Sequence, residues 1–306
     1  MPILDHNGQP IIAQQLKAAE ATATPWGVRK ATSQVSLTGL DPARLAHLLR
    51  AAEHTDSRPY LELAEEMEEK YLHYAAQLAT RKRAVVALEW SVEPASDKLR
   101  DKKIAEFVGK ALPAIKAATF DMLDCIGKGF SVGELMWDTS GGEWKISCIE
   151  RRDPRWFQHD KVDGKTLRMR SDMNPDGDLL TPGKYLVINA SGKSGLPIRG
   201  GLARAAAYAY LFHNFSLRDW VTFCEMFGIP LRLGRYEGGV ASPADLNVLY
   251  QAVHDLGTDS AAMLPKNMEI EFPTVGSGRV GADLWENLLD YLDRQVSKLV
   301  LGQTLT

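Results

Sequence analysis

The last segment of the chain carries apolar side chains at helical spacing, with polar residues between them. A stripe at i, i+3, i+4, i+7, i+11, i+14 and i+15 predicts an amphipathic helix, and its members are Trp285, Leu288, Leu289, Leu292, Val296, Leu299 and Val300. Asp283 and Glu286 lie near its start and Lys298 near its end, as the helix dipole favours. Gly302 is suited to end the helix, because glycine adopts the left-handed conformation at low cost.

Similar spacing predicts several helices in the first half of the chain. Asp41 and Pro42 are residue types preferred at the start of a helix, whose apolar face is Leu45, Leu48, Leu49 and Ala52. One longer helix is predicted after Pro59, with the stripe Leu63, Met67, Tyr71, Tyr74 and Leu78. Two more are predicted over 97–110 and 113–128. Residues 1–40 show no sustained period, so we expect an arm with one short helix over 11–21.

Alternation with a period of two predicts strands in the middle of the chain. After the basic run 81–83, such alternation predicts a strand through Val86, Leu88, Trp90 and Val92. Segments 130–137 and 144–149 are joined through Ser140, Gly141 and Gly142, which indicates a hairpin. Short strands are expected around 155–158, 167–170 and 185–189, with turns at 175–177 and 182–183.

The longest helix is predicted over 202–227, after Gly200 and Gly201. It is apolar on nearly all sides, which indicates burial by its own fold or by neighbouring subunits. A strand over 231–235 follows, then a helix over 243–256 with Ser242 as N-cap, then a strand pair of 262–264 with 268–272. Helices and strands in this order predict an α+β fold.

Length, composition and net charge limit the classes of function that the chain can have. The chain has 306 residues, enough for two or three domains of ~100–200 residues. Its net charge of −3 argues against a protein that grips nucleic acid, but it does not argue against one that lets DNA slide past. The scattered Cys125, Cys148 and Cys224 indicate a reducing compartment without a disulfide framework. No signal-peptide pattern is visible, and the longest apolar run, 205–217, is shorter than the ~20 residues of a membrane span.

Two charged segments each admit a structural and a functional interpretation. The acidic run lies mostly outside its helix stripe, so we favour a solvated face over a metal or partner site; its members are Glu62, Glu65, Glu66, Glu68 and Glu69. Arg151, Arg152 and Arg155 stand in one segment with Trp156 and Phe157, as in a nucleic-acid stacking platform or a strand end with snorkelling arginines. We favour the second, in which these arginines pair with acids of neighbouring segments or subunits.

No catalytic pattern stands out. Asn189–Ser194 resembles a phosphate loop, but Val187 stands where its first glycine is needed and Pro197 interrupts any following helix, so a mobile loop is expected. The histidines are dispersed, and no cysteine pair has metal-ligand spacing. Cys224 lies in an aromatic helix and is expected to be an inert core residue. The sequence therefore predicts no catalytic, cofactor or metal site.

Four blocks stand out together, namely Arg81–Trp90, Ile149–Phe157, Asp219–Pro230 and Val300–Thr306. Their order resembles the portal proteins of Mu-like tailed bacteriophages, and the resemblance covers about residues 35–306. The last two blocks carry the most specific positions, which are Trp220, Phe223, Glu225, Phe227, Gly228, Pro230, Leu301, Gly302, Gln303 and Thr304.

The resemblance implies a structural subunit of a ring, usually of twelve copies, at one vertex of the capsid. Such a ring forms the channel for DNA packaging and ejection and is a head–tail connector. Its implied partners are further copies of itself, the terminase, capsid and tail-connector proteins, and DNA that passes non-specifically. It implies no enzyme activity, no cofactor and no membrane, and a place in the virion, with assembly in the host cytoplasm.

The family architecture also implies a division of the chain. Residues 1–40 would form an arm, 41–198 a wing-like α+β region, and 199–306 a stem- and clip-like region with long helices. Family members continue past the closing block, so we expect a chain cut short at its C-terminus, with exposed apolar surface on the 285–300 helix. Two alternatives remain: a soluble enzyme with a dispersed site, which needs a deep pocket, and a sequence-specific DNA-binding protein, which the charge disfavours.

Overall fold

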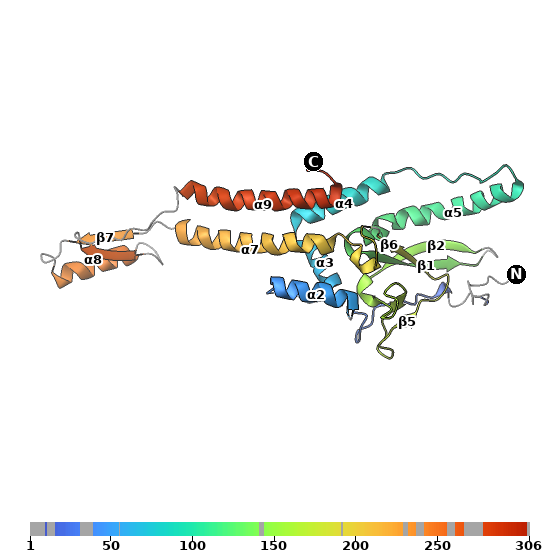
Figure 1. Cartoon of the computed structure of the whole chain (residues 1–306), viewed down its shortest axis with the longest axis horizontal. Coiled ribbons are helices and arrows are strands. Elements are labelled where there is room, and N and C mark those ends of the chain that lie inside the picture. Colours follow the sequence, from blue (N-terminus) through green and yellow to red (C-terminus); the bar gives the residue numbers. More distant parts are fainter. Residues whose placement is uncertain are drawn as a thin grey trace. The chain divides into compact units, whose positions relative to one another are not determined.

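The computed structural model divides the chain into two compact units. One comprises Met1–Leu211 with Asp293–Thr306, the other Phe212–Leu292. The boundaries fall inside two helices, α7 (Ala203–Gly228) and α9 (Gly278–Leu301) (Figure 1). The described residues are 10, 16–30, 39–54, 56–140, 144–190, 192–228, 232–236, 242–255, 261–265 and 278–304.

The first helix after the N-terminal segment forms as the sequence predicts. It is α2 (Pro42–His54), and its buried residues are the predicted Leu45, Leu48, Leu49 and Ala52. The Arg44 N–H donates to Asp41 Oδ1 at 2.7 Å, so Asp41 is the N-cap. A local cap and a local stripe were sufficient to define this helix.

The single long helix predicted after Pro59 is two helices, α3 (Arg58–Lys70) and α4 (Leu72–Val86). The break is at Tyr71, whose φ of −96° and ψ of 88° are not helical. The predicted stripe is nevertheless buried, from Leu63 through Tyr71 to Leu78. Hydrogen bonds continue across the break, since the Tyr71 N–H donates to Met67 O and the Ala75 N–H to Tyr71 O, both at 3.0 Å.

The predicted strand through Val86 and Val92 is wrong. Helix α4 continues to Val86, and residues 89–94 have no regular structure. Contacts far apart in the sequence extend the helix: the Arg81 Nη1 donates to Val300 O at 2.7 Å, and Lys82 is buried. The alternating Leu88 and Trp90 are left exposed.

The two helices predicted over 97–110 and 113–128 are also divided differently. One helix, α5 (Leu99–Met122), contains Pro113 in its interior, and a short α6 (Cys125–Lys128) follows. An interior proline costs about 3 kcal/mol because it removes a hydrogen bond and crowds the preceding turn. Burial of Ala118 and Met122 against Ile149 of the adjoining sheet offsets that cost.

The predicted hairpin is confirmed as β1 (Phe130–Asp138) with β2 (Lys145–Arg152), which pair antiparallel. The third strand, β6 (Tyr185–Asn189), joins on the other side of β1, so the sheet order is β2-β1-β6. Helix α5 covers one face of this sheet, where partly buried residues complete the core, namely Ile115, Leu135, Ile146, Leu186 and Ile188.

A second antiparallel sheet has the order β3-β4-β5, formed by β3 (Phe157–His159), β4 (Leu167–Met169) and β5 (Asp178–Leu179). The strand expected at 155–158 starts later, because Pro154–Trp156 form the short 3-10 helix η1. Gly177 and Gly183 have φ values of +77° and +72°, which confirms the predicted turns.

Close backbone contact fixes the start of α7. After the 3-10 helix η2 (Pro197–Arg199), the Leu202 N–H donates to Ile126 O at 2.9 Å. A Cβ placed on Gly201 would lie 2.4 Å from Gly127 O and 2.5 Å from Gly129 N. Only glycine therefore allows α7 to begin directly against the end of α6.

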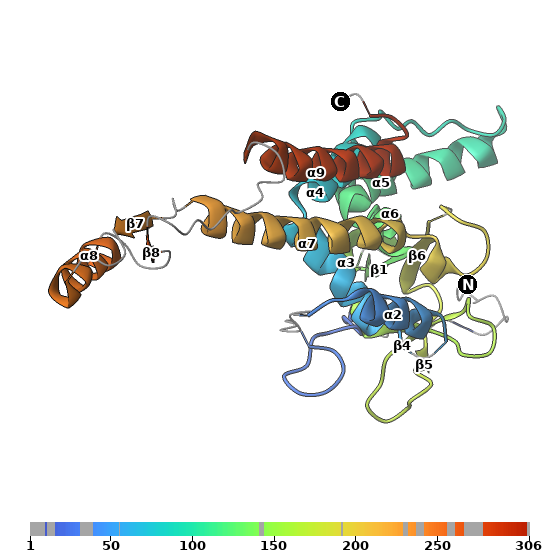
Figure 2. The ribbon, with the colours of Figure 1, turned by 60° about the vertical axis from the view of Figure 1, so that its left-hand side comes forward.

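The last turns of α9 pack beside α4 (Figure 2). Tyr71 donates its hydroxyl to Asp293 Oδ1 at 3.0 Å, and His73 Nε2 lies 2.7 Å from Ser297 Oγ. The stripe residues Val296 and Val300 are buried, whereas Leu288 is exposed, so the expected exposure holds for part of the stripe. Gly302 ends the helix as predicted, with a φ of +78° and its N–H donating to Lys298 O at 3.0 Å.

The second unit contains a strand–helix–strand segment. Strands β7 (Arg232–Tyr236) and β8 (Ala261–Pro265) pair in parallel, and α8 (Pro243–Asp255) connects them. The first strand of the predicted pair 262–264 with 268–272 is β8, which pairs with β7; residues 268–272 lie outside the described residues, so their pairing stays a prediction. Ser242 caps α8 reciprocally: its N–H donates to Asp245 Oδ2 at 3.2 Å, and the Asp245 N–H donates to Ser242 Oγ at 3.3 Å.

Candidate functional site

A buried cluster of charges joins four elements of the first unit. Asp124, the residue before α6, accepts from Lys128 Nζ at 2.6 Å, from Lys82 Nζ at 3.1 Å and from Arg151 Nη2 at 2.9 Å. Glu68 of α3 accepts from Lys128 Nζ at 2.9 Å, and Glu65 from Arg151 Nη2 at 3.2 Å. Three bases thus meet three acids, and the cluster ties α3, α4, α6 and β2 together.

The environment of Asp124 keeps it charged. Burial alone would raise the pKa of its carboxyl, but the charges of Lys128, Lys82 and Arg151 hold that pKa below its usual range. For Lys128, burial opposes charging, yet Asp124 and Glu68 raise its pKa above the usual value. Asp124 and Lys128 are thus both held in their charged forms, so neither is poised to exchange a proton and the role of the cluster is structural.

This cluster corrects the interpretation of the acidic run as a solvated face. Glu65 and Glu68 point into the protein and hold Lys128, and Glu62 is buried. The sequence could not reveal this, because their partners Lys128 and Arg151 lie far along the chain.

The structural interpretation of the arginine-rich segment is confirmed. Arg151 belongs to the cluster above, Arg152 Nε lies 2.6 Å from Glu134 Oε2, and Arg155 Nε donates to Asp153 Oδ2 at 2.9 Å. Trp156 and Phe157 are buried, so neither presents a ring face for a stacked base.

Glu134 also fastens the N-terminal segment to the sheet. It is fully buried on β1 and accepts from the N–H groups of Glu20 and Ala21 at 2.6 and 3.2 Å. The equally buried Lys184 lies 3.4 Å from Glu134 and donates to Leu16 O at 2.7 Å. Part of the predicted arm is therefore an integral piece of the first unit.

Exposed apolar side chains gather along α5 in the first unit. Residues 87–98 run outward from α4, and α5 runs back over the sheet (Figure 1). We call its exposed residues the α5 face, namely Leu99, Ile104, Phe107 and Val108. Phe107 also lines an apolar cleft of about 150 Å³ with Trp137 and Trp144 of the hairpin. Contiguous exposed apolar surface of this kind marks an interaction site.

Comparison with known proteins identifies the family. The sequence model of a family described as the portal protein of Mu bacteriophage matches residues 61–306. The chain belongs to this portal protein family.

Two curated relatives agree with this assignment. The Mu-like prophage FluMu protein gp29 of Haemophilus influenzae is 32% identical over 310 residues, and the portal protein of Escherichia phage Mu is 32% identical over 308. Each match covers 99% of this chain but 59% of the relative, so the chain spans about three fifths of their length. The family resemblance expected from the sequence blocks is thereby confirmed.

The family-motif positions lie in different units. Trp220 and Phe223 are half-buried on α7 and Glu225 is exposed, in the unit that also contains Phe227 and Gly228. Pro230 lies outside the described residues. Leu301 ends α9, and Gly302, Gln303 and Thr304 follow it in the first unit. Their role in the portal family stays a prediction.

The enzyme alternative predicts a deep pocket lined by titratable groups. A groove of about 480 Å³ beside α7 has no histidine, cysteine or carboxylate among its lining residues. No cluster of potential metal ligands occurs within the described residues, and the three cysteines are free. Cys224, expected in the core, is exposed. Among the described helices, none has the length and apolarity to span a membrane.

Proposed function

We propose that this chain is the structural subunit of a phage portal, a ring at one capsid vertex that forms the channel for DNA packaging and ejection. The observation that carries the proposal is the family match over residues 61–306. The ring contains about twelve copies, docks the terminase during packaging and later the tail-connector proteins, and performs no catalysis.

Exposed apolar surface supports the ring. The α5 face, together with Tyr208 and Phe212 on α7, would be costly to leave in water. A second copy of the chain is the occupant we propose for the α5 face, since a ring repeats one contact between identical subunits. Helix α7 is apolar on nearly all sides, and part of its apolar surface stays exposed in this chain. Contact with a second copy would bury that surface too.

The family resemblance is the basis on which we divide the chain as a portal subunit. We assign residues 41–198 to a wing, with the two small sheets and α2–α6, and 199–306 to stem and clip. Helices α7 and α9 are the long helices of the stem, and the β7–α8–β8 segment is the clip. The net charge of −3 favours free passage of DNA over tight binding.

The test is electron microscopy and native mass spectrometry of the complete portal polypeptide, with heads purified from phage lysates. We expect closed rings, and heads that contain the protein at one vertex. Heads made without it should contain no DNA. A polypeptide that stays monomeric at micromolar concentration and is absent from heads contradicts the proposal.

A further inference from the structure

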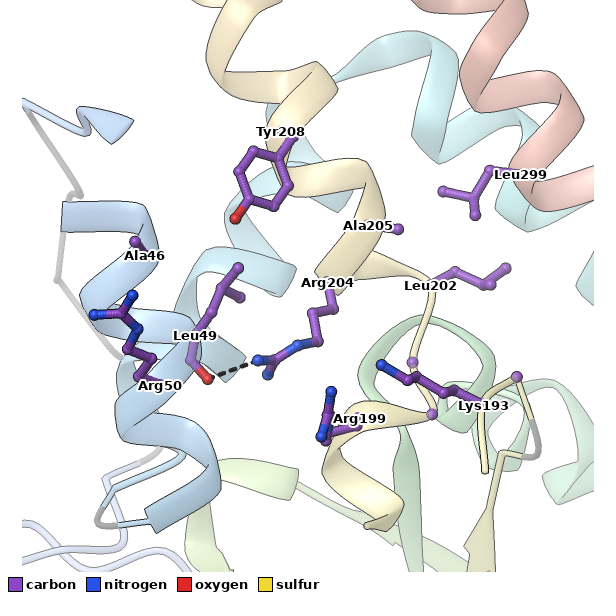
Figure 3. A pocket seen from close by; sticks show the side chains of 13 residues that line it. Ala46, Leu49, Arg50, Lys193, Arg199, Leu202, Arg204, Ala205, Tyr208 and Leu299 are labelled. Carbon is purple, nitrogen blue, oxygen red and sulfur yellow. Dashed lines mark hydrogen bonds between the residues drawn. The ribbon is translucent and has the colours of Figure 1, made fainter. Parts of the chain in front are cut away.

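The groove beside α7 gathers basic side chains from three parts of the first unit. Its volume is about 480 Å³, and its basic lining residues are Arg50 of α2, Lys193, Arg199 of η2 and Arg204 of α7. Figure 3 shows the ends of Lys193, Arg199 and Arg204 directed into the groove, with Arg50 at its outer edge. Apolar Leu49, Leu202 and Ala205 line the rest.

One carboxylate, that of Glu53, contacts two arginines of the groove without lining it, and it does not satisfy them. Arg204 pairs through Nη2 with Glu53 and donates to Leu49 O at 2.9 Å. Arg199 Nε lies 3.5 Å from the same Glu53 oxygen, without hydrogen-bond geometry. The buried Arg204 Nη1 and Arg199 Nε have no hydrogen-bond partner among the described residues. Buried donors without an acceptor are rare and costly.

The charge balance of the groove is positive. Lys193 and Arg50 are exposed, and neither forms an ion pair within the part of the chain that the structure describes. Four basic groups against the one carboxylate of Glu53 leave three positive charges uncompensated. In a chain whose net charge is −3, this local excess of positive charge points to an anionic ligand.

We propose that this groove binds a phosphate group. A phosphate offers several strong acceptor oxygens, which can take the free N–H groups of Arg199 and Arg204 while Lys193 contributes a point charge. A second carboxylate fits less well, because it brings one negative charge to three uncompensated positive ones. The phosphate comes either from solution or from a DNA backbone, and the DNA source rests on the proposed portal function.

The first experiment titrates the 306-residue chain with sodium phosphate by calorimetry, against sodium chloride at equal ionic strength. Saturable binding is expected. Lys193→Gln with Arg199→Gln should weaken it by roughly tenfold or more, since each removes a charge-assisted contact. Lys193→Gln alone should weaken it too, and because this side chain is exposed, we expect the variant to fold.

The matched control is Arg83→Gln with Lys165→Gln, which removes one exposed arginine and one exposed lysine outside the groove. It should leave phosphate affinity unchanged. Absence of saturable binding, or an equal loss in control and groove variants, overturns the proposal. The proposal is also overturned if the chain does not bind phosphate and a groove variant loses self-association. The groove would then be a contact with a second copy of the chain.

The second experiment separates the two sources of phosphate. With a short DNA duplex, the slope of log affinity against log salt should become less steep by about one for each phosphate contact removed. If a variant that has lost phosphate binding still binds the duplex as the wild type does, the phosphate site is upheld. The DNA backbone is then overturned as the source of the phosphate. Ring formation is measured separately, so failure of the portal proposal leaves the phosphate result standing.

Discussion

Lys128 and Asp124 form a buried ion pair one helical turn apart, with 2.6 Å between Nζ and Oδ1. Their side chains are 1% and 6% exposed. Around this pair, Lys82, Arg151 and two glutamates connect helices α3 and α4 to the edge strand β2. The pair is therefore the point where the N-terminal helices are attached to the sheet.

Asp124→Asn should lower the free energy of unfolding by about 3–5 kcal/mol, because it leaves three buried cations without their central anion. Urea unfolding followed by circular dichroism measures the effect. As a control, Lys102→Met breaks the exposed Lys102–Asp97 pair and should have no measurable effect, since solvent screens such pairs. A wild-type stability for Asp124→Asn would show that the cluster does not hold these elements together.

Gly201→Ala should destabilise the first unit by about 1–3 kcal/mol, the usual cost of overpacking. Its added methyl would lie 2.4 Å from a backbone oxygen, which cannot rotate away as a side chain can. Gly109→Ala is the matched control on α5, where nothing lies within 4 Å of the added methyl. That change should stabilise by about 0.5–1 kcal/mol, because alanine loses less backbone entropy in a helix. Thermal unfolding of both variants should therefore shift in opposite directions.

Sequence reasoning succeeded where the determinants are local. Helices α2 and α8 were predicted with their capping residues Asp41 and Ser242, and the hairpin from its alternation and turn. It failed where distant contacts decide: the strand expected at 86–92 was lost to α4, which Arg81 anchors to the end of α9.

The candidate sites, like the secondary structure, were predictable from the sequence only where the contacts are local. Pairing of the arginines 151–155 with acids was predictable, because carboxylates are abundant nearby. The inward orientation of Glu65 and Glu68 was not, since Lys128 lies far along the chain. The signal for the basic groove was the phosphate-loop-like segment Asn189–Ser194, which contains Lys193. Arg50 and Arg204 could not be connected with it, because they come from helices that meet only in the fold.

Stability should depend on pH through His159. Burial lowers its pKa to about 4, and its ring lies against that of Phe130 with 5.0 Å between centroids. The unfolded state, with a pKa of about 6.5, binds a proton more readily, so stability is full above pH 6.5 and falls as the pH approaches 4. The loss should amount to roughly 2–3 kcal/mol.

His159→Phe should remove this component of the pH dependence, as measured by urea unfolding at several pH values between 4 and 7. His54→Gln changes an exposed histidine at the end of α2 and should retain the wild-type profile. Equal profiles for wild type and His159→Phe would mean that His159 is not held neutral by burial.

Ring assembly should depend on the α5 face. Phe107 and Ile104 are both 51% exposed, so Phe107→Asp with Ile104→Asp should leave the fold intact. Two charges in an apolar contact between subunits would be desolvated without partners, so the proportion of rings in electron micrographs should fall at least tenfold. Val162→Asp with Met173→Asp is the control, because these residues are 97% and 93% exposed and lie outside that face. If both pairs assemble like the wild type, another surface joins the subunits, and α7 with Tyr208 becomes the next to test.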